Sequence, residues 1–128
     1  MAHFVKLNQN NEVVDIIVVS NDDINNLPFP ESEPVGIAWI QNWSGDTSSV
    51  WKQTSYNANF RRAHAGIGYV YDADKDAFVL PKPYPSWIFN EDLWIWEPPI
   101  PYPTGDKYYV WNEETTSWIW QDANGNVR

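Results

Sequence analysis

Residues 69–121 read YVYDADKDAFVLPKPYPS, then WIFNEDLWIWEPPIPYPT, and after a four-residue insertion YVWNEETTSWIWQ, so one pattern is written three times. When the copies are aligned on Asp72, Asn90 and Asn112, an aromatic residue stands directly before each of these positions. Another aromatic residue stands six positions after each of them. The six aromatic residues are Tyr71, Phe89 and Trp111 before the aligned positions, and Phe78, Trp96 and Trp118 after them. Self-similarity of this kind predicts a repeated structural unit.

Each copy has the pattern of a β-hairpin, because aromatic residues alternate with other residues on both sides of a polar segment. In the third copy the polar segment 112–117 is rich in residues that favour turns by bonding to their own backbone. We therefore expect the flanking aromatic residues to meet as cross-strand pairs. The proline-rich segments 81–85 and 99–103 predict stiff polyproline II spacers between the hairpins.

The composition limits the partners of this chain of 128 residues. Its net charge of −9 argues against binding to nucleic acid or to an anionic membrane. Because it has no cysteine, it can form no disulfide. We find neither a signal-peptide core at the start nor an apolar run of the roughly 20 residues that a membrane span needs, so we expect a soluble chain made in a cytoplasm.

The N-terminal half predicts a small α+β arrangement. Residues 3–7 and 13–19 flank a turn-rich segment and predict a hairpin, and the second run is so apolar that we expect it to be covered on both faces. A short helix is expected to begin near Pro34, to end at Gly45 and to lie against this hairpin. Residues 50–55 alternate like a further strand.

The predicted fold class is therefore mainly β, with α+β character at the N-terminus. An N-terminal hairpin and one short helix are followed by three repeated aromatic hairpins joined by polyproline segments. We expect a small α+β domain at 1–65 and an arm of hairpin repeats at 66–128. Because an arm of this kind buries little of its own surface, its aromatic rings are expected to pack on other subunits or on the N-terminal half. The candidate interface residues are Tyr71, Phe78, Trp87, Trp94, Trp96, Tyr109, Trp111, Trp118 and Trp120.

The residues Asp72, Asp74 and Asp76 have the spacing that opens a calcium-binding loop. Such a loop needs Gly at its sixth position and Glu at its twelfth, where this chain has Ala77 and Pro83. The sequence therefore favours a solvated turn, and we predict no metal site and no cofactor.

The only basic cluster, Arg61, Arg62 and His64, could bind an anion or supply an acid–base group. We find no nucleophile with an adjacent base, and the paired carboxylates Glu91 and Asp92 lie in a predicted turn. We therefore predict no catalytic residues and a protein that is not an enzyme. The basic cluster is expected to form salt bridges with the acidic surface of a neighbouring copy.

The aromatic residues allow two interpretations. Exposed Trp and Tyr side chains at alternate strand positions can stack on sugar rings, which would make the chain a receptor- or glycan-binding module. The same rings can form a core or a subunit interface. We favour core and interface, because the rings occur on both strands of every predicted hairpin.

The segments 1–19, 51–87 and 111–118 resemble small proteins encoded by marine tailed bacteriophages, including phages of cyanobacteria. The most specific parts of this resemblance are GIGY-x-YD at 66–72 and PKPYPSW at 81–87. The N-terminal hairpin is also similar to the start of phage tail-fibre assembly proteins. The resemblance implies a phage context, and it assigns no functional residue.

These observations predict a non-enzymatic, virion-associated structural protein of a tailed phage. It would act in capsid decoration or in tail or fibre attachment, with its aromatic hairpins in contact with other virion proteins and with copies of itself in a homo-oligomer. One alternative is a receptor- or glycan-binding module that takes a host surface glycan. The other is a tail-fibre assembly chaperone, which would be absent from the finished particle.

Overall fold

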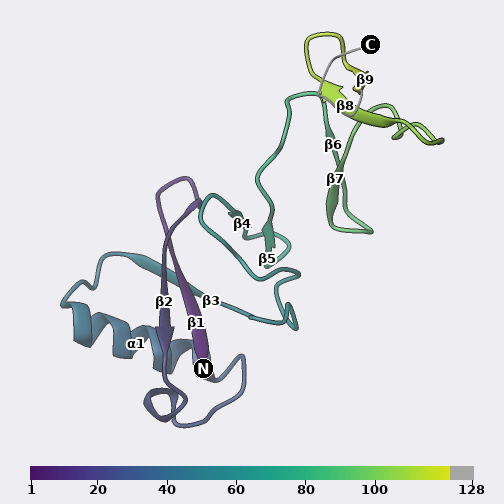
Figure 1. The fold of residues 1–128 in the computed structure, drawn as a ribbon. Coiled ribbons are helices and arrows are strands. Elements are labelled where there is room, and N and C mark those ends of the chain that lie inside the picture. The colour runs from purple at the N-terminus through teal and green to yellow at the C-terminus, as the bar shows by residue number, and fades with distance from the viewer. Residues whose placement is uncertain (122–128) are drawn as a thin grey trace. The chain divides into compact units, whose positions relative to one another are not determined.

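The computed structural model describes residues 1–121 and divides the chain into two compact units, Met1–Pro81 and Lys82–Arg128 (Figure 1). The fold is mainly β, made of small antiparallel sheets, with one short α-helix, which confirms the predicted fold class. Among the described residues, no helix combines the length and the apolar character needed to cross a membrane.

The first unit is built on a three-stranded antiparallel sheet of β1 (Ala2–Leu7), β2 (Val13–Val19) and β3 (Val50–Thr54), in the order β2-β1-β3. The predicted N-terminal hairpin and the third strand are thus confirmed. Because successive side chains of a strand point to opposite faces, the central strand β1 supplies apolar residues to two separate cores.

One face of this sheet is covered by α1 (Ser32–Ser44). The helix ends at Gly45, whose φ of 75° is readily adopted only by glycine, as predicted. It begins at Ser32, two residues before the predicted start at Pro34. The helix lies so close to the sheet that a Cβ atom at Gly36 would stand 2.1 Å from Phe4 Cζ. The core on this face consists of Ala2, Phe4, Val19, Ile24 (from the 3₁₀ turn Asp22–Ile24), Ile40 and Trp51.

The opposite face is covered by the first repeated hairpin, β4 (Val70–Asp72) and β5 (Ala77–Val79), together with the loop before it. Val13 N donates to Tyr69 O at 2.8 Å, so the hairpin is also tied to the edge of the sheet. The core here consists of Val5, Leu7, Val13, Ala65, Tyr71 and Phe78. The domain boundary predicted between residues 65 and 66 is therefore corrected to Pro81/Lys82, because the first hairpin completes the core of the N-terminal unit.

Strand β2 is covered only in part. Ile17 packs against the helix-side core and Ile16 against the hairpin-side core, as the apolar run predicted. Val14, at the β-bulge opposite Lys6/Leu7, and Val18 are exposed, so the expectation that the whole run is covered on both faces is corrected.

The second unit contains the other two repeats, β6 (Ile88–Asn90) with β7 (Ile95–Glu97), and β8 (Tyr108–Asn112) with β9 (Ser117–Gln121). All three hairpins have the same register. The cross-strand pairs are Tyr71 with Phe78, Phe89 with Trp96, and Trp111 with Trp118, as the aligned sequences predicted.

The turns of the three hairpins are also equivalent. The side-chain oxygens of Asp72, Asn90 and Asn112 each accept a hydrogen bond from a backbone N–H two or three residues later. Four residues after each of these positions the backbone enters the left-handed region. The residues there are Asp76 (φ 50°), Trp94 (φ 59°) and Thr116 (φ 47°).

Candidate functional site

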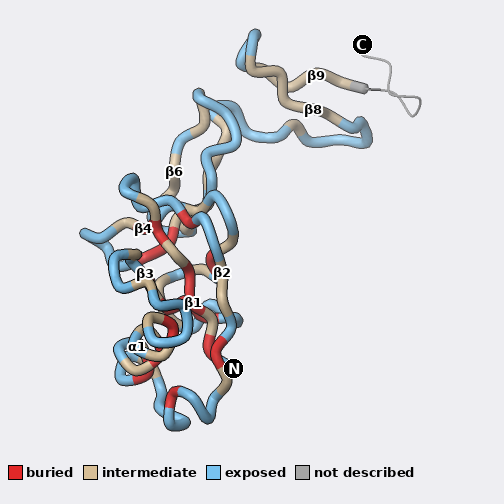
Figure 2. Tube along the Cα trace, turned by 90° about the vertical axis from the view of Figure 1, so that its left-hand side faces the viewer, coloured by how far each residue is buried: buried red, intermediate tan, exposed pale blue. Residues whose placement is uncertain are grey.

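The second unit carries eleven aromatic side chains on two small hairpins and their spacers. All of the residues that form the buried cores lie in the first unit, and no residue among the described positions 82–120 is buried (Figure 2). The aromatic residues of the second unit are Tyr84, Trp87, Phe89, Trp94, Trp96, Tyr102, Tyr108, Tyr109, Trp111, Trp118 and Trp120.

Part of this set forms a connected cluster on hairpin β8–β9. The cross-strand neighbours Trp111 and Trp118 lie 5.2 Å apart between ring centroids. Trp87 lies edge-on to both of them, at 5.9 Å from Trp111 and 6.4 Å from Trp118. Tyr102 contacts Trp118 at 4.9 Å with an interplanar angle of 77°. These edge-to-face arrangements are the ones that aromatic quadrupoles favour.

The carboxylate of Glu113 fixes the spacer before β6 to this cluster. It accepts hydrogen bonds from Trp111 Nε1 at 2.9 Å, from Ser86 Oγ at 2.7 Å and from Ser86 N at 3.0 Å. The bond from Trp111, followed by that from the Ser86 hydroxyl, lowers the pKa of Glu113 below its ordinary value.

The spacer between β7 and β8 is held in a similar way. Trp118 Nε1 donates to Ile100 O at 2.8 Å, and Tyr109 N donates to the Tyr102 hydroxyl at 3.0 Å. Both proline-rich spacers of the second unit therefore bind to hairpin β8–β9.

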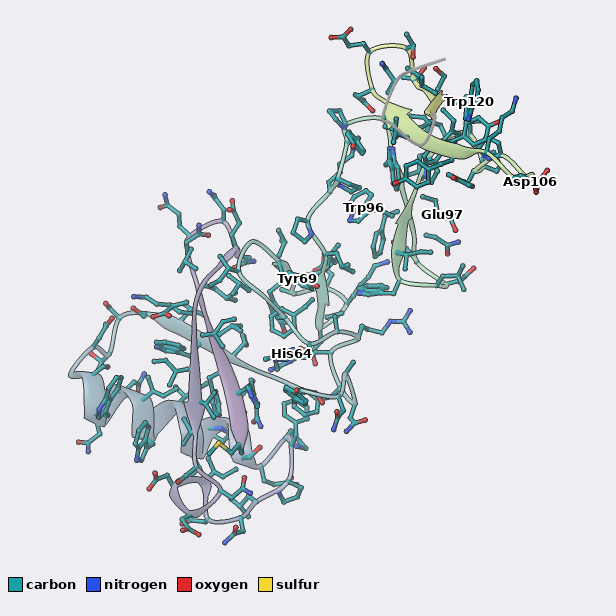
Figure 3. All side chains as sticks on the ribbon, in the orientation of Figure 1. His64, Tyr69, Trp96, Glu97, Asp106 and Trp120 are labelled. Atoms are coloured by element: carbon teal, nitrogen blue, oxygen red, sulfur yellow. The ribbon has the colours of Figure 1, made fainter. Side chains whose placement is uncertain are left out.

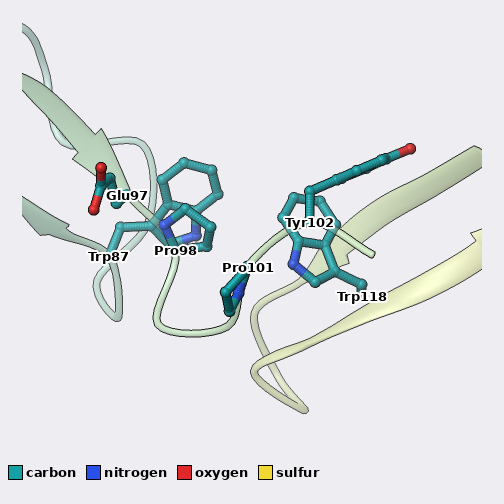
Figure 4. Close-up of a pocket in the computed structure, with 6 residues that line it drawn as sticks. All are labelled: Trp87, Glu97, Pro98, Pro101, Tyr102 and Trp118. Carbon is teal, nitrogen blue, oxygen red and sulfur yellow. The ribbon is translucent and has the colours of Figure 1, made fainter. Parts of the chain in front are cut away.

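A pocket of about 480 Å³ opens between this spacer and the aromatic cluster, within the second unit (Figure 4). The carboxylate of Glu97 is oriented by Asn90 Nδ2, which donates to Glu97 Oε1 at 3.0 Å. Trp87 Nε1 is buried, without an acceptor among the described residues, so Trp87 offers the pocket its ring and not a donor. The pocket is lined by Trp87, Glu97, Pro98, Pro101, Tyr102 and Trp118.

A lysine ammonium group lies over each of two other indole rings of this unit. Lys82 Nζ lies 5.4 Å from the centroid of Trp96, and Lys107 Nζ lies 4.7 Å from that of Trp120. Figure 3 shows Trp96 beside Glu97 on β7, and Trp120 on the last hairpin. Attraction between an ammonium group and an aromatic face is thus already used twice within the unit.

The predicted interface residues separate into two groups. Tyr71 and Phe78 are 8% and 0% exposed in the core of the first unit, so their prediction as interface residues is corrected. The hairpin pattern of the first copy could not reveal this, because the same pattern in the other copies stays half-exposed. The seven other predicted residues, Trp87, Trp94, Trp96, Tyr109, Trp111, Trp118 and Trp120, lie in the second unit.

The structure brings Trp87, Trp111 and Trp118 together, whereas Trp94 and Trp96 pack on Phe89 of hairpin β6–β7, each at 5.0 Å. Sequence reasoning missed the pocket residues Glu97 and Tyr102. The repetition of Pro-Tyr-Pro at 83–85 and 101–103 was a signal for Tyr102. We find no comparable signal for Glu97.

Arg61 forms its ion pairs within its own unit, which corrects the predicted contact with a neighbouring copy. Its guanidinium pairs with Glu33 of α1 and, at 2.9 Å, with Asp76 in the β4–β5 turn. It also donates to Gln53 O at 2.9 Å, and Gln53 N donates to Glu33 at 2.7 Å. Arg61 and Glu33 thereby satisfy backbone groups on the outer edge of β3.

His64, the acid–base candidate, lies beside two other rings. Its ring centroid is 5.5 Å from that of His3 and 5.2 Å from that of Tyr56. Burial, followed by repulsion from His64, lowers the pKa of His3.

The three aspartates considered for calcium do not form a common site. Asp76 binds the Tyr71 hydroxyl and Arg61, whereas Asp72 bonds to the backbone of its own turn. Within residues 1–121, no three His, Asp or Glu side chains gather as metal ligands would. The hydrogen bond from Tyr71 lowers the pKa of Asp76, while burial and this bond raise the pKa of Tyr71 to about 12.

No protein-family model, curated protein or solved structure matches this chain.

Proposed function

We propose that this chain is a virion-associated structural protein of a tailed phage, placed on the capsid or at a tail or fibre attachment point, which uses its aromatic hairpins for subunit contacts. The observation that supports this proposal is the exposure of the second unit. It has eleven aromatic side chains, all between residues 82 and 120, and none of them is buried. Large apolar side chains also face solvent there, with Ile88 65%, Leu93 64% and Tyr108 66% exposed.

A surface of this composition suits an interface. Burial of apolar area is the main favourable term in protein association, and aromatic residues are enriched where subunits meet. The hairpins present their rings on a backbone that is already ordered by equivalent turns, which reduces the entropy lost on docking.

Three of the polar groups that the sequence suggested for catalysis or metal binding, Arg61, Asp72 and Asp76, have structural roles. Arg61, Glu33 and Asp76 hold the first unit together. Asp72 closes its own turn. These roles are consistent with a structural protein, and they leave the aromatic surface as the main candidate for an external contact.

Quantitative mass spectrometry of purified particles of the phage that encodes this chain tests the proposal. We expect the protein at a fixed copy number relative to the major capsid or tail protein, with a non-structural phage enzyme as the negative control. Absence from particles that are otherwise complete would overturn the proposal and favour the assembly chaperone.

A further inference from the structure

The pocket of the second unit has walls that repel anions and attract cations. Trp87, Tyr102 and Trp118 present aromatic rings, whose faces carry a negative potential. Among the described residues that line it, Glu97 is the one with a charged side chain.

The side chains that line the pocket offer almost no hydrogen-bond donor. Trp118 Nε1 is engaged by Ile100 O, and Trp87 Nε1 is buried. The Tyr102 hydroxyl points away from Trp87 and Pro101 (Figure 4). A peptide carbonyl or a phosphate, both of which need donors, would therefore be poorly bound.

The net charge of the second unit also favours a cationic ligand. Described residues 82–121 carry the two cations Lys82 and Lys107, each of which lies over an indole ring. Against them stand six carboxylates: Glu91, Asp92, Glu97, Asp106, Glu113 and Glu114. The unit thus raises the local concentration of cations and already uses indole rings to bind them.

We propose that this pocket binds a methylated ammonium group, such as the trimethylammonium head of choline. Such a group needs no hydrogen-bond partner, and its methyl groups can pack on the aromatic rings and on Pro98 and Pro101, while Glu97 compensates the charge. The volume of about 480 Å³ lies within the range of roughly 300–1,000 Å³ that is usual for small-molecule sites. A neutral sugar fits less well, because its hydroxyl groups need donors as well as acceptors.

NMR titration of the full chain with choline tests this proposal, with the indole N–H signals of Trp87 and Trp118 as reporters. We expect both signals to shift in a saturable way. Dimethylbutanol, the uncharged analogue in which carbon replaces the ammonium nitrogen, should bind roughly tenfold more weakly. Equal binding of the analogue, stronger binding of glucose, or unchanged indole signals at high millimolar choline would overturn the proposal.

A matched pair of variants tests the role of Glu97. Glu97→Gln keeps an oxygen for Asn90 but removes the charge, and it should weaken choline binding roughly fivefold. Glu114→Gln makes the same charge change in the exposed turn of the last hairpin and should leave the affinity unchanged. Equal weakening by both variants would mean that only the net charge of the protein affects choline binding. That result would contradict a specific site at Glu97.

Phosphocholine distinguishes the sources of the head group. Because the side chains of the lining offer almost no donor, we expect phosphocholine to bind no more tightly than choline. That result would indicate a free or peptide-linked methylated amine. Tighter binding of phosphocholine would still place trimethylammonium in the pocket and would indicate a phosphocholine-bearing lipid or polymer. Binding of inorganic phosphate with the same shifts would overturn the proposal. The particle experiment is independent of each of these results.

Discussion

Arg61 shows how one side chain can connect the elements of a small unit. Its side chain is 6% exposed and that of its partner Glu33 is 17% exposed, so their ion pair is shielded from water. The pair joins the first turn of α1 to the outer edge of β3, and Asp76 extends it to hairpin β4–β5. Removing Arg61 would leave the charge of Glu33 and the backbone carbonyl of Gln53 without compensation.

We predict that Arg61→Met destabilises the first unit by about 3 kcal/mol, because Glu33 and Gln53 O would lose their charged partner. Urea denaturation should show a lower midpoint with an unchanged slope. Arg62→Met changes the same charge at the exposed neighbouring position and should stay within about 0.5 kcal/mol of wild type. Equal effects of the two variants would refute the structural role of Arg61.

Tyr71 makes the unfolding free energy of the first unit fall at alkaline pH. Its folded pKa of about 12 lies above the ordinary value of 10.0, so the folded state retains the proton that the unfolded state loses. This contribution is complete below pH 10 and is lost as the pH rises towards 12. We predict that Tyr71→Phe flattens the decline of the unfolding free energy in this range. An identical decline in the variant would show that Tyr71 does not cause it.

The three hairpins reach one backbone geometry with different residues at the left-handed position of the turn. Asp76 there binds Tyr71 and Arg61, and the ring of Trp94 packs against Phe89. Thr116 is β-branched, and its hydroxyl donates to the neighbouring Thr115 O at 2.8 Å. A left-handed conformation is costly for such a residue, so the third turn carries strain that glycine would relieve.

We predict that Thr116→Gly stabilises the last hairpin by up to about 1 kcal/mol, since relief of the strain exceeds the entropy cost of glycine. The control Thr115→Gly changes the preceding residue, which has a negative φ, and should be neutral or destabilising. Thermal unfolding followed by the near-ultraviolet signal of the tryptophans would measure both. A loss of stability in Thr116→Gly would contradict the strain assigned to this position.

At the scale of the whole molecule, the boundary between the units separates repeats that look alike in sequence. The first hairpin supplies Tyr71 and Phe78 to a core that also needs Val5 and Leu7 of β1. A fragment of residues 1–81 should therefore unfold cooperatively, at a denaturant midpoint close to that of the first unit in the full chain. A fragment of residues 1–65 should fail to fold, because one face of its sheet would be uncovered. Cooperative folding of the shorter fragment would restore the boundary at residue 65.

Local patterns in the sequence predicted the local geometry well. The alternation of aromatic residues gave the pairs Phe89–Trp96 and Trp111–Trp118, and Gly45 gave the end of the helix. Contacts between distant segments were not predictable in this way. The pairing of Arg61 with Glu33 spans 28 residues and depends on the path of an irregular loop. The pocket forms because the spacer between β7 and β8 binds Trp118 through Ile100 O. No local sequence pattern around Glu97 indicates this contact.

The central proposal is that the exposed side chains of the hairpins contact other subunits. Trp118 is a poor probe, because its ring also holds the spacer through Ile100. Ile88 is a better one, since it is 65% exposed on β6. Ile88→Thr removes apolar surface but keeps a β-branched side chain, and Val14→Thr makes a comparable change at an exposed strand position of the first unit.

Sedimentation velocity over a range of protein concentrations tests this proposal most directly. We expect the wild-type chain and Val14→Thr to associate above the monomer mass of 14.9 kDa as the concentration rises, and Ile88→Thr to require a several-fold higher concentration. A wild-type chain that remains a monomer at every concentration, or an Ile88→Thr variant that associates like Val14→Thr, would contradict it.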